Sequence, residues 1–326
     1  MRIGTMIAAL IASVLSTGLG RATELRVLAS WDDTAPSRNI LLQTYLKNVE
    51  AASKGDITFK ISGPETVPAF EQLQPVSAGV FQMLFTHGAY HVGATPLLIA
   101  VDGLKGTGQS LRASGIFAII DKQYQRFGLK LVFMAKSPEG TGYQIILRTP
   151  VGPSGDLSGR KIRGTQTYTG ALTALGASPV VLPPGEIYSA LEKGVVDGAG
   201  WPSIGVREFR WTEVAKYLVR PTFGASPYFL FVNLNAWNKL TDAQRNLLTE
   251  EGKKIEAFWD TESVRLIKDE ESALLAQGAQ LTQLGAGPAA KVSAEFEKGL
   301  WDLAAKSDPA AVKELHDFTR QHGLSD

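Results

Sequence analysis

The stretch of residues 159–201, GRKIRGTQTYTGALTALGASPVVLPPGEIYSALEKGVVDGAGW, decides the fold of this chain. Residues 161–163 are predicted to form a short strand that runs into a small-residue turn and a helix ending at Gly176. A second apolar strand, residues 180–182, stops at two prolines, and a second helix is expected over residues 186–194. Two strand–helix units in so short a stretch predict a parallel α/β sheet.

Arg163 stands at the carboxyl end of the first of these strands. In parallel α/β sheets, ligands bind at the carboxyl ends of strands. A guanidinium offers two parallel N–H donors, which match the two oxygens of a carboxylate. From these residues alone, a surface salt bridge is an equally good interpretation of Arg163.

Composition narrows the class of protein. The 326 residues suit one large domain or two medium ones, and 44% of them are hydrophobic, as in a globular protein with a sizeable core. The net charge is +1 and the basic residues are scattered, which argues against nucleic acid or an anionic membrane as a partner. The absence of cysteine excludes disulfides, thiolate metal sites and a cysteine nucleophile.

The N-terminus has the features of a secretory signal peptide. Arg2 is followed by the apolar core MIAALIASVL at residues 6–15, which is too short to cross a bilayer. Small residues up to Ala22 form a cleavage site, and polar sequence starts at Thr23. We expect residues 1–22 to be removed near Ala22 and the mature chain to be periplasmic; a buried N-terminal helix is the alternative.

Periodicity outlines the rest of the fold. Alternating apolar residues predict strands at residues 25–29, 57–61 and 81–85, with helices between them, so the chain opens β-α-β-α-β. Residues 228–232 read as a buried strand that returns to this first unit. From Thr241, an N-cap residue, a helical pattern runs to about residue 277; a helix of that length measures about 50 Å. Amphipathic helices over residues 289–318 close the chain.

The segments DLSGRKIR…ALGASPVVLPPGEIYSALEKGVVDGAGWP and VPAFEQLQ…THGAYHVG resemble the solute-binding proteins of tripartite ATP-independent periplasmic (TRAP) transporters, the DctP-like family. The nearest branch takes up 2-oxo acids and similar small carboxylates. The resemblance implies a two-lobed, type II-like periplasmic binding protein with two mixed sheets and one helix across both lobes. Lobe 1 would comprise residues 23–141 and 229–268, and lobe 2 residues 142–228 and 269–326.

The resemblance also implies site residues. Arg163 matches the carboxylate-binding arginine of the family, and Gln144 matches a glutamine that donates to the ligand. Tyr90 matches a pocket tyrosine and Trp201 a pocket tryptophan. A satisfied strand residue is the alternative for Gln144, and plain core packing is the alternative for Trp201.

Two further candidates rest on the residues themselves. Trp31 follows the first strand, where an aromatic side chain can line a pocket. Thr165 offers a hydroxyl to the ligand or a cap to the next helix. Asp32 and Asp33 beside Trp31 are interpreted as a solvated loop.

We predict no metal and no cofactor. In the resembling branch, acidic residues before the tryptophan and later in the chain hold a bridging cation, but this chain has Gly200 and no acid at residues 223–227. Hard cations need several oxygen ligands. His87 and His91 have zinc-like spacing for a helix, but they follow a strand and lack a nearby Glu. The arginine that many family members carry near residues 141–143 is also missing, which argues against a dicarboxylate or a long acidic sugar.

We therefore expect a non-enzymatic protein that captures a small monocarboxylate, such as a 2-oxo or 2-hydroxy acid, by hinge closure and delivers it to membrane permease subunits. We expect a monomer, with a dimer left open. A ligand sensor for a membrane receptor is the first alternative. An exported enzyme is the second, although the chain has no GxSxG or HExxH motif and its GLKGTG loop, residues 103–108, has neither Rossmann nor phosphate-loop spacing.

Overall fold

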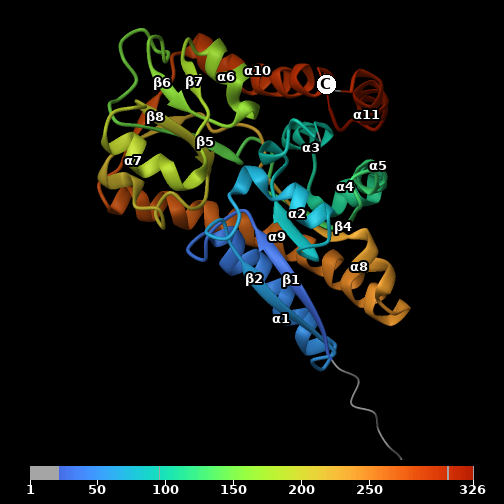
Figure 1. Cartoon of the computed structure of the whole chain (residues 1–326). Helices are drawn as coiled ribbons and strands as arrows, with labels where there is room; N and C mark the ends of the chain where they lie inside the picture. The colour runs from blue at the N-terminus through green and yellow to red at the C-terminus, as the bar shows by residue number, and fades with distance from the viewer. Residues whose placement is uncertain (1–21, 95, 307, 326) are drawn as a thin grey trace, which may run out of the picture.

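The structure is a computed structural model that describes residues 22–325 apart from positions 95 and 307. The predicted signal peptide, save its last residue, lies outside the described residues. Two mixed β-sheets organise the described chain, and helices flank both of them (Figure 1). This confirms the predicted class, a mixed α/β protein with two sheets.

Sheet A has the strand order β2-β1-β3-β10-β4. Its central strand pairs are parallel, β1 with β2 and β1 with β3, as the opening β-α-β-α-β pattern predicts. The late strand β10 enters between β3 and β4 and runs antiparallel to both. The strands are β1 (Thr23–Ala29), β2 (Ile57–Ser62), β3 (Met83–Thr86), β4 (Leu129–Lys136) and β10 (Pro227–Asn233).

Sheet B has the strand order β11-β9-β5-β8-β6-β7. Its strands are β5 (Tyr143–Leu147), β6 (Lys161–Arg163), β7 (Ser178–Val180), β8 (Gly198–Pro202), β9 (Tyr217–Arg220) and β11 (Gln280–Gln283). The parallel β6–β7 pair confirms the parallel unit expected in residues 159–201. The second strand begins earlier than predicted and contains Pro179, which is tolerated because β7 is an edge strand.

Short helices connect the strands. Those beside sheet A are η1 (Ser37–Leu42), α1 (Gln43–Ala52), η2 (Ala69–Glu71), α2 (Leu73–Ser77), η3 (Gly88–Tyr90), α3 (Leu97–Ala100), η4 (Val101–Gly103), α4 (Gly108–Ser114), α5 (Ile116–Gln125) and α8 (Leu234–Lys239). Those beside sheet B are η5 (Gln166–Tyr168), α6 (Thr169–Ala174), η6 (Pro184–Glu186), α7 (Ile187–Glu192) and η7 (Trp211–Glu213). Gly115, whose φ of 100° ends α4, separates that helix from α5.

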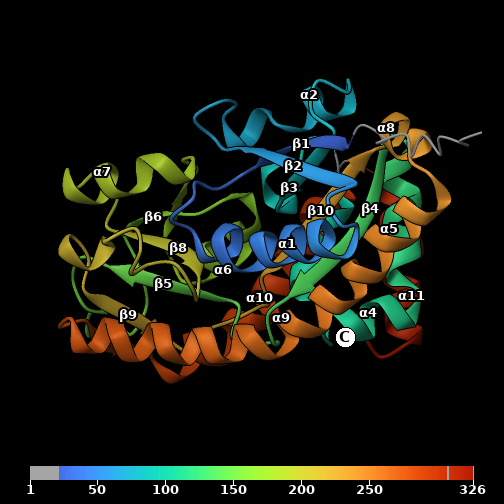
Figure 2. The ribbon, with the colours of Figure 1, turned by 90° about the horizontal axis from the view of Figure 1, so that it is seen from below.

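The long helix α9 (Asp242–Ala276) confirms the prediction from its uninterrupted pattern. It begins with a capping box, in which the Thr241 side chain accepts from the Gln244 N–H and the Gln244 side chain accepts from the Thr241 N–H. Figure 2 shows α9 running beneath both sheets. It packs on β4 beside sheet A, and its Glu270 accepts backbone N–H groups of Gly205 and Arg207, which follow β8 of sheet B.

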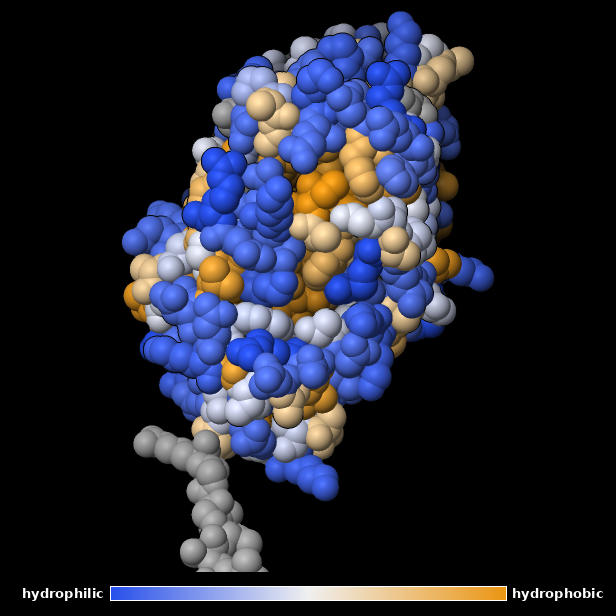
Figure 3. Space-filling view, turned by 90° about the vertical axis from the view of Figure 1, so that its right-hand side faces the viewer, coloured by the Kyte–Doolittle hydropathy of each residue, from blue (hydrophilic) through white to orange (hydrophobic). Residues whose placement is uncertain are grey.

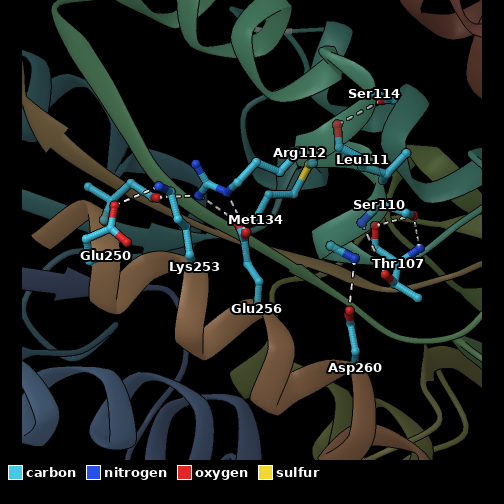
Figure 4. A network of polar contacts seen from close by, with 12 residues as sticks. Thr107, Ser110, Leu111, Arg112, Ser114, Met134, Glu250, Lys253, Glu256 and Asp260 are labelled. Carbon is cyan, nitrogen blue, oxygen red and sulfur yellow. Dashed lines mark hydrogen bonds and ion pairs between the residues drawn. The ribbon is translucent and has the colours of Figure 1, made fainter.

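Polar contacts also tie α9 to α4 (Figure 4). The guanidinium of Arg112 donates to both carboxylate oxygens of Glu256, at 2.6 and 2.8 Å. The same carboxylate accepts the backbone N–H of Met134, at 2.8 Å. A turn further along α9, Asp260 accepts the N–H of Gly108 at the start of α4. The helix is therefore fixed to the edge of sheet A by buried, directional bonds.

The C-terminal helices α10 (Ala286–Ala305) and α11 (Pro309–Gln321) lie against both parts of the molecule. α10 packs on α6 beside sheet B and on α3 beside sheet A, and α11 packs on α5. The α6–α10 contact is close because Gly170 and Gly299 meet there; a Cβ on Gly170 would lie 2.6 Å from the carbonyl oxygen of Glu295. The chain passes between the sheets after β4, after β9 and after α9.

Candidate functional site

Side chains from both sheets enclose a small cavity. Its empty volume is about 300 Å³. The lining combines aromatic rings with a few polar groups, as small-molecule sites do. It consists of Trp31, His87, Ala89, Tyr90, Tyr143, Arg163, Thr165, Tyr168, Trp201, Pro202 and Ser226. All the predicted ligand residues except Gln144 are in this set.

Arg163 is the positively charged residue of the cavity lining and is only 1% exposed. It ends β6, and backbone carbonyls hold its guanidinium in place. Nε and Nη2 donate to the carbonyl oxygen of Leu182, at 3.0 and 2.7 Å, and Nη1 donates to that of Gly200, at 3.2 Å. The guanidinium carbon also lies 5.4 Å from the ring centroid of Trp201, within the range of a cation–π interaction.

The charge of Arg163 is buried without a carboxylate partner. Among the described residues, no Asp or Glu oxygen lies within ion-pair distance of its guanidinium. Burial lowers the pKa of this guanidinium below its usual value. A guanidinium has five N–H donors, and the bonds to Leu182 and Gly200 use one on each nitrogen. One N–H on each Nη atom therefore remains available to donate to an anion.

Aromatic rings form the walls on the sheet A side. Trp31, two residues after the end of β1, packs against Tyr90 and Tyr228 with ring centroids 5.6 and 5.4 Å apart. Tyr90 ends η3, which follows β3. Burial raises the pKa of the Tyr90 phenol well above its usual value, so the phenol is neutral and serves as a hydrogen-bonding group and an apolar wall.

The sheet B side supplies Trp201 and Thr165. Trp201 lies in β8 and is 3% exposed, with its ring 5.1 Å from Trp211 and 5.4 Å from Phe209. It both packs in the core and lines the cavity, so the two interpretations of Trp201 are compatible. The Thr165 hydroxyl is 2.7 Å from that of Thr167 and caps no helix.

Gln144 is buried but does not line the cavity. Its amide oxygen accepts from Arg220 Nη1 over 3.4 Å. Its neighbour Tyr143 lines the cavity instead. Successive residues of a strand point to opposite faces of the sheet, so only one of Tyr143 and Gln144 can face the cavity. A direct role for Gln144 stays a prediction.

Tyr143 belongs to a buried network that the sequence analysis missed. Its hydroxyl donates to Asp102 Oδ2 at 2.7 Å and lies 2.9 Å from His87 Nε2. His87 Nε2 is in turn 3.2 Å from the same carboxylate oxygen, and Asp102 is fully buried. Asp102 follows an apolar run in the LLIAVDG segment, which is the only sequence signal for a buried acid here.

Tyr168, the other missed aromatic, explains why residue 200 is a glycine. A Cβ at Gly200 would lie 2.7 Å from Cε1 of the Tyr168 ring. The space beside Gly200 therefore holds the ring of Tyr168, while the carbonyl of Gly200 orients Arg163.

The two histidines do not converge on one site. His91 Nε2 lies 2.9 Å from the hydroxyl of Thr86, and burial lowers the pKa of His91 to about 3. His87 instead faces Tyr143 and Asp102. Within the described part of the chain, no group of three or more His, Cys, Asp or Glu side chains has the arrangement of a metal site. No helix among the described residues is long and apolar enough to cross a membrane.

A two-sheet α/β scaffold with a buried arginine in a cavity between the sheets is the architecture of a ligand-binding protein. Residues 116–306 match the model of the family described as bacterial extracellular solute-binding protein, family 7 (DctP). The chain belongs to this family, which confirms the resemblance found in the sequence.

Individual proteins similar to this chain are also solute-binding proteins. The chain is 31% identical over 229 residues to the monocarboxylate 2-oxoacid-binding periplasmic protein of Nostoc sp.; the match covers 66% of this chain but only 61% of that protein. It is 27% identical over 286 residues to a solute-binding protein of Albidiferax ferrireducens, covering 84% and 83% of the two chains. A TRAP periplasmic solute-binding protein of Desulfovibrio salexigens, solved with bound orotic acid, has the same fold, with a TM-score of 0.81, 22% identity and coverage of 91% and 97%.

Proposed function

We propose that this protein is the solute-binding component of a TRAP transporter and captures a small monocarboxylate, a 2-oxo or 2-hydroxy acid, for delivery to membrane permease subunits. The observation that carries the proposal is the buried guanidinium of Arg163, held by the backbone and without a carboxylate partner among the described residues. A buried charge is costly unless it is paired, so the cavity favours an anion.

The neighbouring side chains suggest how the rest of the ligand is held. The carboxylate takes the two remaining N–H groups of Arg163. The hydroxyls of Tyr90 and Thr165 offer hydrogen bonds to an oxygen on the second carbon, and the rings of Trp31 and Trp201 exclude water. Exclusion of water strengthens the ion pair. Gln144 would join this set only through a direct contact with the ligand.

The proposed ligand-binding residues come from both lobes, so closure of one lobe onto the other would clamp the ligand between them. Under the proposed division, Trp31 and Tyr90 belong to lobe 1, residues 23–141 and 229–268, whereas Arg163, Thr165 and Trp201 belong to lobe 2, residues 142–228 and 269–326. A ligand that contacts both lobes binds the closed form better than the open form and shifts the population toward it. The protein would need no metal, cofactor or catalytic group for this task.

The relatives support the class of ligand. The Nostoc protein is named for monocarboxylate 2-oxoacids, and the Desulfovibrio protein was solved with orotic acid, so a carboxylate recurs. The family description supports a location outside the cytoplasm for the mature chain, and the name of the Nostoc relative supports the periplasm. Presentation of the same ligand to a membrane receptor is the second candidate, because it would use the same clamp. Isolation of the membrane proteins that bind the liganded form separates the two.

The test is a binding screen on the purified mature chain. We expect pyruvate, lactate and other short or branched 2-oxo and 2-hydroxy acids to raise the melting temperature by mass action, and isothermal titration calorimetry to give one site per chain. The amides of the same acids should not bind, because they lack the charge that Arg163 requires. Binding of neutral sugars or amides in place of acids would contradict the proposal. Binding that is lost in chelator and restored by calcium would contradict the proposal that the ligand binds without a metal ion.

A further inference from the structure

A second, larger hollow lies on the surface beside the cavity. Its empty volume is about 1000 Å³, and it opens between α2, the C-terminal end of α5 and the loop after η3. Phe70, Leu73, Ala94 and Phe127 give it an apolar lining, with Gln74 at its side. Figure 3, seen from the side of α5, shows apolar side chains gathered in a hollow among polar ones. We call this hollow the outer groove.

Tyr90 is the one residue that lines both the cavity and the outer groove. On the cavity side its ring packs against Trp31, with centroids 5.6 Å apart, and against His87, at 6.2 Å. On the groove side it packs against Phe70, at 5.4 Å. The Tyr90 ring, in a residue that is 8% exposed, therefore lies at the boundary between the small cavity around Arg163 and the much larger apolar outer groove.

The two spaces differ in what they can hold. The cavity offers a guanidinium and hydroxyl groups but little room, with an empty volume of about 300 Å³ against about 1000 Å³ for the outer groove. The outer groove offers room and apolar surface, with Glu71 and Arg126 in its lining as the charged residues. If the Tyr90 ring were absent, an acid with a long apolar tail could place its carboxylate in the cavity and its tail in the outer groove. Burying each additional methylene of the tail would be favourable.

We propose that Tyr90 determines the length of the ligand: it closes the carboxylate cavity and restricts the protein to acids with short tails. With a small side chain at this position, the tail of a longer acid would pass from Arg163 through the space of the phenol ring into the outer groove. This inference rests on the proposed function, since it takes Arg163 as the anchor of the carboxylate.

The test compares two acids that differ only in the tail, pyruvate and 2-oxooctanoate, by isothermal titration calorimetry. We expect the wild type to bind pyruvate and to reject 2-oxooctanoate. Tyr90→Ala should shift the ratio of the two affinities toward 2-oxooctanoate by about tenfold or more, the effect of two or more newly buried methylenes. Tyr90→Phe, which keeps the ring and removes only the hydroxyl, should leave the wild-type preference for the short acid.

A second change locates the tail. Phe70 is 37% exposed and lines only the outer groove, so Phe70→Ser should be tolerated by the fold. In the Tyr90→Ala background it should reverse the gain for 2-oxooctanoate and leave pyruvate binding unchanged. If Tyr90→Ala does not fold, as judged by its melting curve, Tyr90→Leu takes its place.

The outcomes separate the inference from the function on which it rests. An unchanged ratio of affinities in Tyr90→Ala, or a gain that Phe70→Ser does not reduce, would overturn the role of Tyr90. Wild-type protein that binds 2-oxooctanoate as well as pyruvate would overturn it too. Wild-type protein that binds no carboxylic acid would instead overturn the proposed function.

Discussion

The guanidinium of Arg163 lies over the ring of Trp201, with its central carbon 5.4 Å from the ring centroid. The carbonyl of Gly200, the residue before this tryptophan, accepts from Nη1 of the same guanidinium. Strand β8 therefore holds the arginine from two directions, through a carbonyl and through a π face. A side chain oriented in advance loses little entropy when a ligand arrives, which favours binding.

Replacement of Arg163 by lysine should reduce the affinity for the carboxylate ligand by about 2–5 kcal/mol, because the ligand would lose its buried, bidentate partner. An ammonium is a point charge and cannot donate to Leu182, to Gly200 and to both ligand oxygens in the same geometry. Calorimetric titration measures the loss. Arg160→Lys, three residues earlier and bonded to the carbonyls of Thr149 and Pro150, is the matched control and should keep the wild-type affinity. If the Arg163→Lys variant bound the ligand with wild-type affinity, Arg163 would not be the residue that anchors the carboxylate.

Gly200→Ala should weaken both folding and ligand binding. The new Cβ would lie 2.7 Å from the ring of Tyr168, which is itself packed 5.2 Å from Tyr143, so the ring must move or the strand must shift. Overpacking of this kind costs about 1–3 kcal/mol of unfolding free energy. Because Tyr168 lines the cavity, the affinity for the acid should fall as well.

Gly185→Ala is the control for this substitution, since a Cβ there meets no atom within 4 Å. Its unfolding free energy, measured in urea, should stay within about 0.5 kcal/mol of the wild type. Equal stability of the Gly200 and Gly185 variants would show that the contact with Tyr168 is easily relieved, contrary to this expectation.

The sequence was most informative where one local rule acted alone. Helix α9 has a cap at Thr241, no proline and a continuous apolar period, and it was predicted from Thr241 almost to its last residue. The strand ending in Arg163 was placed by its flanking turn and helix signals. In the cavity, Trp31 and Thr165 were found because each follows a strand end, whereas Tyr90 and Trp201 were found because they match pocket residues of the family.

The sequence was least informative where tertiary packing chose between neighbours. Tyr143 and Gln144 are adjacent, and alternation along β5 guarantees that they diverge, but not which one faces the cavity. Tyr168 lines the cavity because glycine at position 200 admits its ring, and that pairing joins residues far apart in the chain. Asp102 and His87 meet through the same kind of long-range packing.

The buried ion pair of Arg112 and Glu256 should be sensitive to the loss of either partner (Figure 4). Glu256 is fully buried and its pKa is raised to about 6 by desolvation, against the opposing effect of Arg112. Arg112→Met would leave this carboxylate without its counter-charge and should lower the unfolding free energy by about 3–5 kcal/mol. Adding Glu256→Gln should recover part of the loss, since a neutral amide can still accept from the Met134 N–H.

Lys253→Met is the control on the same helix, because the ion pair of Lys253 with Glu250 is exposed. Such surface pairs contribute about 0–1 kcal/mol. Urea denaturation of the variants measures these differences. If Arg112→Met lowered the unfolding free energy as little as Lys253→Met, the buried carboxylate of Glu256 would not need the charge of Arg112.

Glu270 should make the protein more stable as the pH falls. Desolvation raises its pKa to about 7 from the ordinary 4.5, although the N–H groups of Arg207 and Gly205 oppose this. The folded state therefore binds this proton more tightly than the unfolded state, so the contribution grows as pH falls through 7 and is complete below about 4.5. The difference between the two pKa values corresponds to about 3 kcal/mol.

The change that isolates this effect is Glu270→Gln, which retains an acceptor for both N–H groups but cannot titrate. Between pH 8 and pH 5, the wild type should gain more unfolding free energy than this variant, by an amount on the order of 2–3 kcal/mol. Glu271→Gln makes the same change in net charge one residue later, where the carboxylate is 42% exposed and pairs with Arg220, and is the control for that change in charge. Parallel pH profiles for wild type and Glu270→Gln would exclude Glu270 as the source, and would place the titration on other carboxylates such as Glu256.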